Sequence, residues 1–319
     1  MYIDKHGDAW YKCSLHNHTT FSDGKRTPAE LVEIHRAADY DVLAVSDHWL
    51  TWPGELTGDA LPPDTYNCDD RPEFIAAALA ERPDRPKQIG LLNAVELDCG
   101  GIDTRSGVYH ILGLGTCGRT DWSKYHGKAA QDLIDIVRKH KGLAFLAHPA
   151  WSLNTPEMIN SLRHLSGAEI YNTFSDVGFN ARGDSSLLLD IVATHGNLLP
   201  FIATDDTHFL LGEEVTSFTW IKSKSTCRKD LLDALARGDF YASQGPRMAI
   251  SRQAGSFRVE CDPVSEIIFY TNRPFSFERR HYGTDITEHT YTPHEHDKYL
   301  RVEIRGADGK RAWSSPIKV

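Results

Sequence analysis

The sequence predicts an α/β fold in which about seven strands, most of them followed by a helix, form a closed or nearly closed parallel barrel. Short apolar runs alternate with helical patterns over the first two-thirds of the chain, which is typical of βα units. Several of these runs end in His, Asp or Glu, as barrel strands that carry a site do. After about residue 246 the runs are short, turn residues separate them and no helical period is evident. We therefore expect a barrel over residues 1–245 and a small antiparallel β module over 246–319. A β-sandwich is a candidate form for this module.

The expected elements follow from local patterns. The barrel strands are expected at 11–15, 41–45, 91–97, 109–114, 143–147, 168–171 and 198–203, and the module strands at 248–250, 257–261, 266–271, 276–280 and 299–304. The first helix should begin at Pro28, because Thr27 is a suitable N-cap and Glu30 completes a capping box. Further helices are expected near 128–140, 156–164, 184–195 and 227–237. The segment 51–72 holds four prolines and is expected to be a lid or specificity loop.

Composition excludes several classes of protein. In the 319 residues, 40% hydrophobic and 25% charged residues are ordinary for a globular protein, and no apolar run approaches the roughly 20 residues of a membrane helix. The first residues lack the apolar stretch of a secretory signal, so we expect a cytoplasmic protein without a membrane span. The balance of 35 Lys+Arg against 44 Asp+Glu, a net charge of -9, argues against general nucleic-acid binding. The six cysteines form no CxxC pair, which argues against a thiolate zinc site.

Histidines and carboxylates occur at or near the ends of several expected strands. His16 and His18 lie on the same side of the first strand, because side chains alternate along a strand, and Asp23 follows in the next turn. Other strands carry further candidate ligands, which are His48, Glu96, His110, His148, Asp206 and His208. A single His at a strand end is most often structural, but five strands that repeat the pattern predict a metal centre. The mixed nitrogen and oxygen set suits Zn, Mn or Fe, and nine ligands suit two or three ions.

This ordered series resembles the motifs of the PHP (polymerase and histidinol phosphatase) metallohydrolases. The resemblance runs from about residue 12 to 210 and rests on His16-Asn-His18, Ser46-Asp47-His48, Glu96, His110, Ala147-His148-Pro149 and Asp206-x-His208. It implies a distorted, TIM-like (β/α)7 barrel with two or three metal ions at the strand ends. Carried over by residue, it implies a first ion on His16, His18, Glu96 and Asp206, a second on Glu96, His110 and His148, and a third on Asp23, His48 and His208. Either Asp205 or Asp206 could be the ligand, and the spacing to His208 favours Asp206.

Such a centre predicts a hydrolase. Two ions about 3.5–4 Å apart lower the pKa of a shared water and polarise a P=O or C=O group. We expect a phosphoesterase, a phosphatase or phosphodiesterase, whose substrate is a small phosphorylated metabolite or nucleotide; the choice of phosphate rests on the resemblance. The alternative is a carboxylic-ester or carbamate hydrolase that uses the same centre. A third and less favoured interpretation is a non-catalytic PHP-like scaffold or binding module.

Roles outside the ligand set are less specified by the sequence. His208 could protonate the leaving group, and Asp47, which lies beside His48, could orient a ligand imidazole, shuttle a proton or simply accept hydrogen bonds at a strand end. Arg182 and Arg26 fall in expected loops after barrel strands, where they could meet a phosphate or remain solvated surface charges. Trp151 could line an aromatic pocket or serve in packing. Lys25, Arg105, Trp49 and Trp52 are further candidates of the same kinds.

Overall fold

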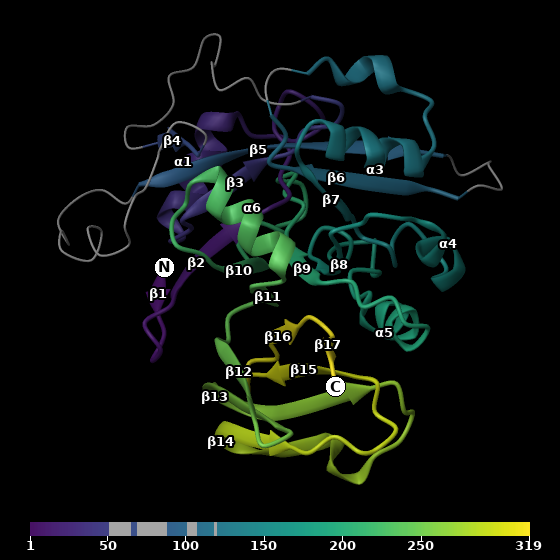
Figure 1. The fold of residues 1–319 in the computed structure, drawn as a ribbon. Coiled ribbons are helices and arrows are strands. Elements are labelled where there is room, and N and C mark those ends of the chain that lie inside the picture. Colours follow the sequence, from purple (N-terminus) through teal and green to yellow (C-terminus); the bar gives the residue numbers. More distant parts are fainter. Residues whose placement is uncertain (51–64, 69–87, 101–106, 118–119) are drawn as a thin grey trace.

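The fold is mixed α/β, with a large sheet and few helices (Figure 1). The computed structural model describes residues 1–50, 65–68, 88–100, 107–117 and 120–319. None of the helices in this part of the chain combines the length and the apolar character that a membrane span requires. Most of the segment 51–72, which was expected to be a lid or specificity loop, lies outside the described residues, and so do the candidate residues Trp52 and Arg105.

The first three-quarters of the chain contains a mixed sheet. Its strands in spatial order are β9 (Phe201–Thr204), β8 (Gly167–Asn172), β7 (Leu143–Leu146), β6 (Tyr109–Leu114), β5 (Ile89–Cys99), β3 (Val42–Val45), β2 (Ala9–Ser14), β10 (Phe218–Lys222) and β11 (Phe240–Ser243). The short strands β1 (Tyr2–Ile3) and β4 (Thr65–Asn67) pair with β2 and β5. All seven expected barrel strands are therefore present, with ends shifted by a few residues.

The closed parallel barrel that the sequence predicts is not confirmed, because the sheet is not closed. A single isolated bridge, between Asn17 and Thr207, joins the ends of β2 and β9. The sheet is also not wholly parallel, since β6 runs antiparallel to both β5 and β7. The connection from β5 to β6, residues 100–108, is shorter than the dozen or more residues that a parallel crossover needs. The strands β10 and β11, which the sequence patterns did not predict, extend the sheet beyond β2: β10 pairs antiparallel with β2, and β11 pairs antiparallel with β10.

The helices occur where helical patterns and caps predict them. Helix α1 (Pro28–Ala37) begins with the expected capping box, in which the Thr27 side chain accepts from the backbone N–H of Glu30 and the Glu30 side chain accepts from the backbone N–H of Thr27. The remaining elements of this class are η1 (Trp122–Tyr125), α3 (Ala130–Lys139), α4 (Pro156–Ser161), α5 (Ser186–Thr194) and α6 (Arg228–Arg237). Helix α6 ends at Gly238, whose left-handed conformation is inexpensive for glycine.

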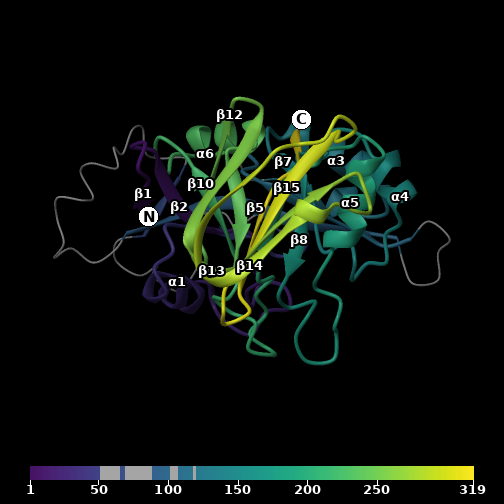
Figure 2. The same ribbon diagram turned by 90° about the horizontal axis from the view of Figure 1, so that it is seen from below.

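The C-terminal strands are antiparallel, as expected, but differ in detail. They are β12 (Met248–Gln253), β13 (Ser256–Thr271), β14 (Arg280–Tyr291), β15 (Tyr299–Arg305), β16 (Arg311–Ser314) and β17 (Ile317–Lys318). Two expected strands, 257–261 and 266–271, are parts of β13, whose register shifts near Val264. The prediction of a strand at 276–280 is wrong, because the 3-10 turn η2 (Phe277–Arg279) occupies most of this range. Figure 2 shows β13, β14 and β15 running side by side.

The C-terminal strands pack into the same cores as the first part of the chain. One buried cluster unites Leu31 and Val45 with Val259 and Phe269. In a second, the fully buried Trp313 of β16 stacks on Tyr171 of β8, with ring centroids 5.6 Å apart. Strand β16 also continues the sheet by pairing with β11. The segment 246–319 is thus joined to the rest of the chain by strand pairing and by shared apolar contacts, and the boundary at residue 245 stays a prediction.

Candidate metal centre

Nine His and carboxylate side chains converge where the strands of the mixed sheet end. Glu96 lies in β5 and His110 in β6, and the other seven lie in the segments that follow β2, β3, β7 and β9. They form three groups in which the candidate ligand atoms lie within 4.8 Å of one another. The groups are His16, His18, Glu96 and Asp206; Glu96, His110 and His148; and His18, Asp23, His48 and His208. The structure thus brings all nine expected ligands together, and their coordination of metal stays a prediction.

The first group is buried and brings two imidazoles and two carboxylates together. Nδ1 of His16 lies 2.8 Å from Oε1 of Glu169, so Nδ1 donates to this carboxylate, and in the neutral ring Nε2 carries the lone pair. That Nε2 lies 3.2 Å from Glu96 Oε2, 3.2 Å from Asp206 Oδ1 and 3.2 Å from His18 Nε2. Oδ1 of Asp206 is buried with no partner that satisfies hydrogen-bond geometry. With His16 and His18 neutral and their Nδ1 atoms donating outward, the Nε2 lone pairs would face the two carboxylates, and a bound cation would satisfy all of them, so these residues fit a metal ion.

Glu96 connects the first two groups through its two oxygens. Oε2 faces His18 at 3.0 Å, His16 at 3.2 Å and His48 at 3.4 Å. Oε1 faces Nδ1 of His110 at 2.9 Å and Nε2 of His148 at 3.2 Å. The carboxylate is almost fully buried, and each oxygen belongs to a different set of imidazoles. This arrangement suits a carboxylate that contacts two cations at once.

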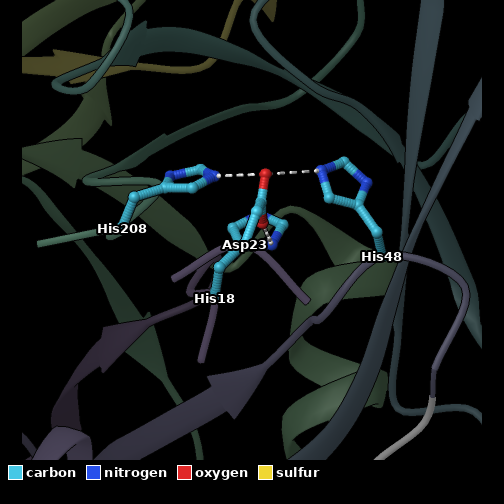
Figure 3. Close-up of side chains that lie close together, drawn as sticks. All are labelled: His18, Asp23, His48 and His208. Carbon is cyan, nitrogen blue, oxygen red and sulfur yellow. Dashed lines mark ion pairs between the residues drawn. The ribbon is translucent and has the colours of Figure 1, made fainter. Parts of the chain in front are cut away.

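The third group is more open to solvent. Figure 3 shows the carboxylate of Asp23 between the rings of His208 and His48, with His18 beneath it. Asp23 Oδ2 lies 3.4 Å from Nε2 of His208 and 3.7 Å from Nε2 of His48, and its Oδ1 lies 3.4 Å from Nδ1 of His18. The Asp23 side chain is 54% exposed, whereas the other carboxylates of the cluster are buried. His18 belongs to this group as well as to the first, a sharing that the sequence patterns did not predict.

The carboxylates hold positive charge in the cluster. Burial alone would lower the pKa of His16, but Asp206, Glu96 and Glu169 raise it well above its usual value. Burial likewise opposes protonation of His208, yet Asp206 and Asp23 raise its pKa to about 9. Burial would raise the pKa of Glu96, but the imidazoles of His16, His110 and His48 keep it well below its usual value. A divalent cation that displaced the imidazole protons would satisfy the same field.

Two of the candidate ligands sit in unusual backbone conformations. Asp206 has φ 54° and His148 has φ 27°, both in the left-handed region that non-glycine residues rarely adopt. The backbone N–H of His148 donates to Glu169 Oε2 at 2.8 Å, and its carbonyl accepts from Ser152 N at 3.1 Å. Nδ1 of His208 donates to the carbonyl of Asp206 at 2.7 Å. These contacts hold strained residues in place, a pattern that is concentrated at functional sites.

Three buried or half-buried carboxylates around the cluster were missed as site residues. Glu169 accepts from His16 Nδ1, and Glu213 accepts from the backbone N–H groups of His208, Leu210 and Leu211. Asp98 lies 3.5 Å from Nδ1 of His48 and accepts from Trp49 Nε1 at 2.6 Å. Asp98 follows Glu96 by two positions and so shares its side of β5; this spacing is the one sequence signal that could have found it.

The two aspartates next to ligands use their carboxylates for other contacts. Asp47 accepts from Thr19 N and Thr19 Oγ1, each at 2.7 Å, and from Ser22 Oγ at 2.6 Å. Ser22 Oγ also lies 3.3 Å from His18 Nδ1. Asp47 is therefore connected to His18 through Ser22, and a role for Asp47 in orienting a ligand imidazole stays a prediction. Asp205 is turned away from the cluster toward Thr173, Thr216 and Ser217, which leaves Asp206 in the ligand position.

The predicted substrate-binding residues differ in their positions. Trp151 contacts the cluster directly, with its ring centroid 5.1 Å from that of His148. Arg182 is exposed in the segment after β8, where its backbone N–H donates to Ser175 O. The Arg26 guanidinium pairs with Glu30 at 3.4 Å on the surface, so this charge is already partly neutralised. Binding of substrate by any of these residues stays a prediction.

Comparison with known proteins finds similar solved structures. No protein family model and no curated protein matches the sequence. A two-domain protein from Bacteroides vulgatus, described as containing a predicted PHP-like metal-dependent phosphoesterase, is 14% identical, with a TM-score of 0.48 over 100% of this chain and 97% of its own. An amidohydrolase from Chromobacterium violaceum, solved with bound sulfate and no metal, is 16% identical, with a TM-score of 0.39 over 61% of this chain and 87% of its own.

Proposed function

We propose that this chain is a metal-dependent hydrolase of the PHP type that cleaves a phosphoester. The observation that carries the proposal is the set of three connected donor groups, in which nine imidazoles and carboxylates converge at one end of the sheet. A scaffold would have no need of a buried cluster whose lone pairs face one another, because each unpaired polar group costs stability. The ordered motif series that resembles the PHP family supports the same proposal.

The first group would hold one cation, the second group another, and the third group a third. Bound divalent cations of this kind activate water and polarise the oxygen of the scissile bond. Glu96 orients the first two groups relative to each other, because each of its oxygens faces a different set of imidazoles. Glu169 holds the lone pair of His16 toward the centre by accepting from Nδ1, and Ser22 does the same for His18.

His208 has one nitrogen available for chemistry. Its Nδ1 donates to the carbonyl of Asp206, so Nε2 alone faces the cluster beside Asp23. The same atom cannot bind a cation and protonate a leaving group at the same time. Because Nε2 points into the third donor group, we propose ligation as its role and assign proton transfer to water. Retention of full metal content with loss of turnover in His208→Ala would instead support the role of proton donor.

Adjacent aspartates offer a matched pair of variants to test the function. Asp206→Asn removes a carboxylate that faces the first group, and Asp205→Asn removes an equally buried carboxylate that faces away from it. The protein, purified without chelator, is assayed for metal content and for turnover of p-nitrophenyl phosphate, bis-p-nitrophenyl phosphate and naphthyl esters with added Mn or Zn.

We expect two or three ions per chain and phosphoester turnover in the wild type. Asp206→Asn should lose turnover and the ion of the first group, while Asp205→Asn should keep its full metal content. Metal with turnover of carboxylic esters alone would replace the phosphoesterase by an ester hydrolase. Less than one ion per chain after reconstitution, with no turnover, would leave a scaffold.

A further inference from the structure

Aromatic side chains lie directly beside the candidate metal ligands. The ring of Trp151, in the segment after β7, meets that of His148 at a centroid distance of 5.1 Å and that of His110 at 5.9 Å, both nearly perpendicular. The ring of Phe174, in the segment after β8, stacks on His208 at 4.3 Å with an interplanar angle of 21°. The two aromatic rings therefore border the second and third donor groups, at different sides of the same cluster.

The side chain of Asn180 connects Trp151 with the backbone of Phe174 through two hydrogen bonds. Asn180 accepts from the indole N–H of Trp151 at 3.3 Å and donates from Nδ2 to the carbonyl of Phe174 at 2.9 Å. The indole N–H of Trp151 thereby has a hydrogen-bond partner, and Trp151 remains 37% exposed. We call Trp151, Phe174 and Asn180 the aromatic wall.

Packing alone does not account for the aromatic wall. A side chain that served only to fill the core would be buried, as Trp122 and Trp313 are, each at 1% exposure or less. Trp151 instead keeps a third of its surface in water while its ring lies nearly perpendicular to the imidazoles of two candidate ligands, His110 and His148. Large apolar rings held in place at the mouth of a polar site are the usual means of orienting a ligand, since they give contact area at little cost in conformational entropy.

We propose that the aromatic wall binds a planar aromatic group of the substrate next to the bond that is cleaved. This inference rests on the proposed function and narrows it to esters that carry such a group. A flat ring gains from edge-to-face or stacked contacts with Trp151 that a saturated ring of similar size cannot make, by a factor of about 3 to 10 in affinity.

Two pairs of compounds separate aromatic recognition from general hydrophobicity. Benzylphosphonate and cyclohexylmethylphosphonate are not hydrolysed, so their dissociation constants can be measured by calorimetry on protein reconstituted with Zn²⁺ or Mn²⁺. Benzyl phosphate and cyclohexylmethyl phosphate have leaving groups of similar basicity, so their kcat/KM ratio reports recognition and not leaving-group chemistry.

The variants are Trp151→Leu and a control, Leu153→Ala. Leu153 lies two residues further along the same segment and is 64% exposed. In the wild type we expect the benzyl member of each pair to be preferred by about 3- to 10-fold. Trp151→Leu should reduce this preference to less than about 2-fold by raising Kd and KM for the benzyl compounds, with metal content unchanged, and Leu153→Ala should keep it.

The outcomes separate this inference from the proposed function. Equal affinity for the two phosphonates in the wild type, or a preference that survives in Trp151→Leu, overturns the aromatic site even if the phosphates are hydrolysed. Aromatic preference in binding without turnover of either phosphate supports the site and counts against phosphoester hydrolysis. If the protein shows no aromatic preference and hydrolyses neither phosphate, both the aromatic site and the proposed function are overturned.

Discussion

Replacing Glu169 with Gln should weaken metal binding by about 10- to 100-fold, a loss of about 1.4–2.7 kcal/mol. The fully buried carboxylate accepts four hydrogen bonds. Oε1 receives those from His16 Nδ1 at 2.8 Å and Thr204 Oγ1 at 2.6 Å, and Oε2 receives those from the backbone N–H of His148 and from Asn172 Nδ2, both at 2.8 Å.

A glutamine can accept at only one of these two positions. If its carbonyl oxygen serves His16 and Thr204, its NH₂ group faces the backbone N–H of His148, and that buried donor stays unsatisfied. Such a group costs about 1–3 kcal/mol, so the metal-free protein should also be less stable. Loss of the negative charge makes His16 a weaker base and so a poorer ligand, which is why metal affinity should fall in addition to stability.

A second buried carboxylate provides the control. Asp297 has no exposed side-chain surface and accepts from Arg273 Nε, Tyr291 OH and His294 N, all in the C-terminal part of the chain. Asp297→Asn should lower the free energy of unfolding in urea by about 1–3 kcal/mol and leave metal affinity unchanged. Metal affinity is measured by competition with a chromophoric chelator. If Glu169→Gln binds metal as tightly as the wild type, the carboxylate supports the fold and does not tune the ligand.

Three further predictions concern the effect of metal on stability, the pH dependence of stability and the segment after β8. Removal of metal with EDTA should lower Tm by about 5 °C, because ligands that bind only the folded state stabilise it, and the decrease should be smaller in Asp206→Asn, which lacks the ion of the first group. Burial lowers the pKa of His35 to about 4, so the stability of its neutral form is present above pH 6.5 and is lost as the pH falls toward 4. Urea unfolding at pH 7 and pH 5 should show about 2 kcal/mol more loss for the wild type than for His35→Phe, and equal losses would contradict the burial argument. Arg311 of β16 pairs with Asp184 at 2.6 Å, at the end of the segment after β8. Arg311→Ala should therefore raise KM by about 3- to 10-fold with unchanged metal content. Arg258→Ala should not raise KM, because the ion pairs of Arg258 lie within the C-terminal strands.

Much of the candidate site could be predicted because its ligands follow local patterns. The alternation of side chains along a strand places His16 and His18 on one side, and apolar strands that end in a polar residue mark His48 and His148. The helix start at Thr27 is likewise a short-range event, decided by a side chain that reaches a backbone N–H three residues away. Interactions of this kind involve neighbours in sequence, so a sequence pattern can report them.

Strand direction and exposed strands were harder to predict. A parallel strand and an antiparallel strand can have the same apolar run, so β6 was expected to be parallel until its pairing with β5 and β7 was known. Strand β14 is exposed along most of its length and lacks the apolar alternation that marks a half-buried strand. Its place in the sheet depends on its hydrogen bonds to β13, which no local pattern encodes.

The sequence by itself determined which residues of this protein could bind metal and at which strand ends they stand. Only the tertiary structure decided how they are shared: that the two oxygens of Glu96 face different imidazoles, that His18 belongs to two groups, and that Asp47 reaches His18 through Ser22. Glu169 shows the physical reason, since it lies 153 residues from His16 and its four donors come from separate parts of the chain. Contacts between residues so distant in sequence depend on how the strands pack, and that packing is a property of the whole chain.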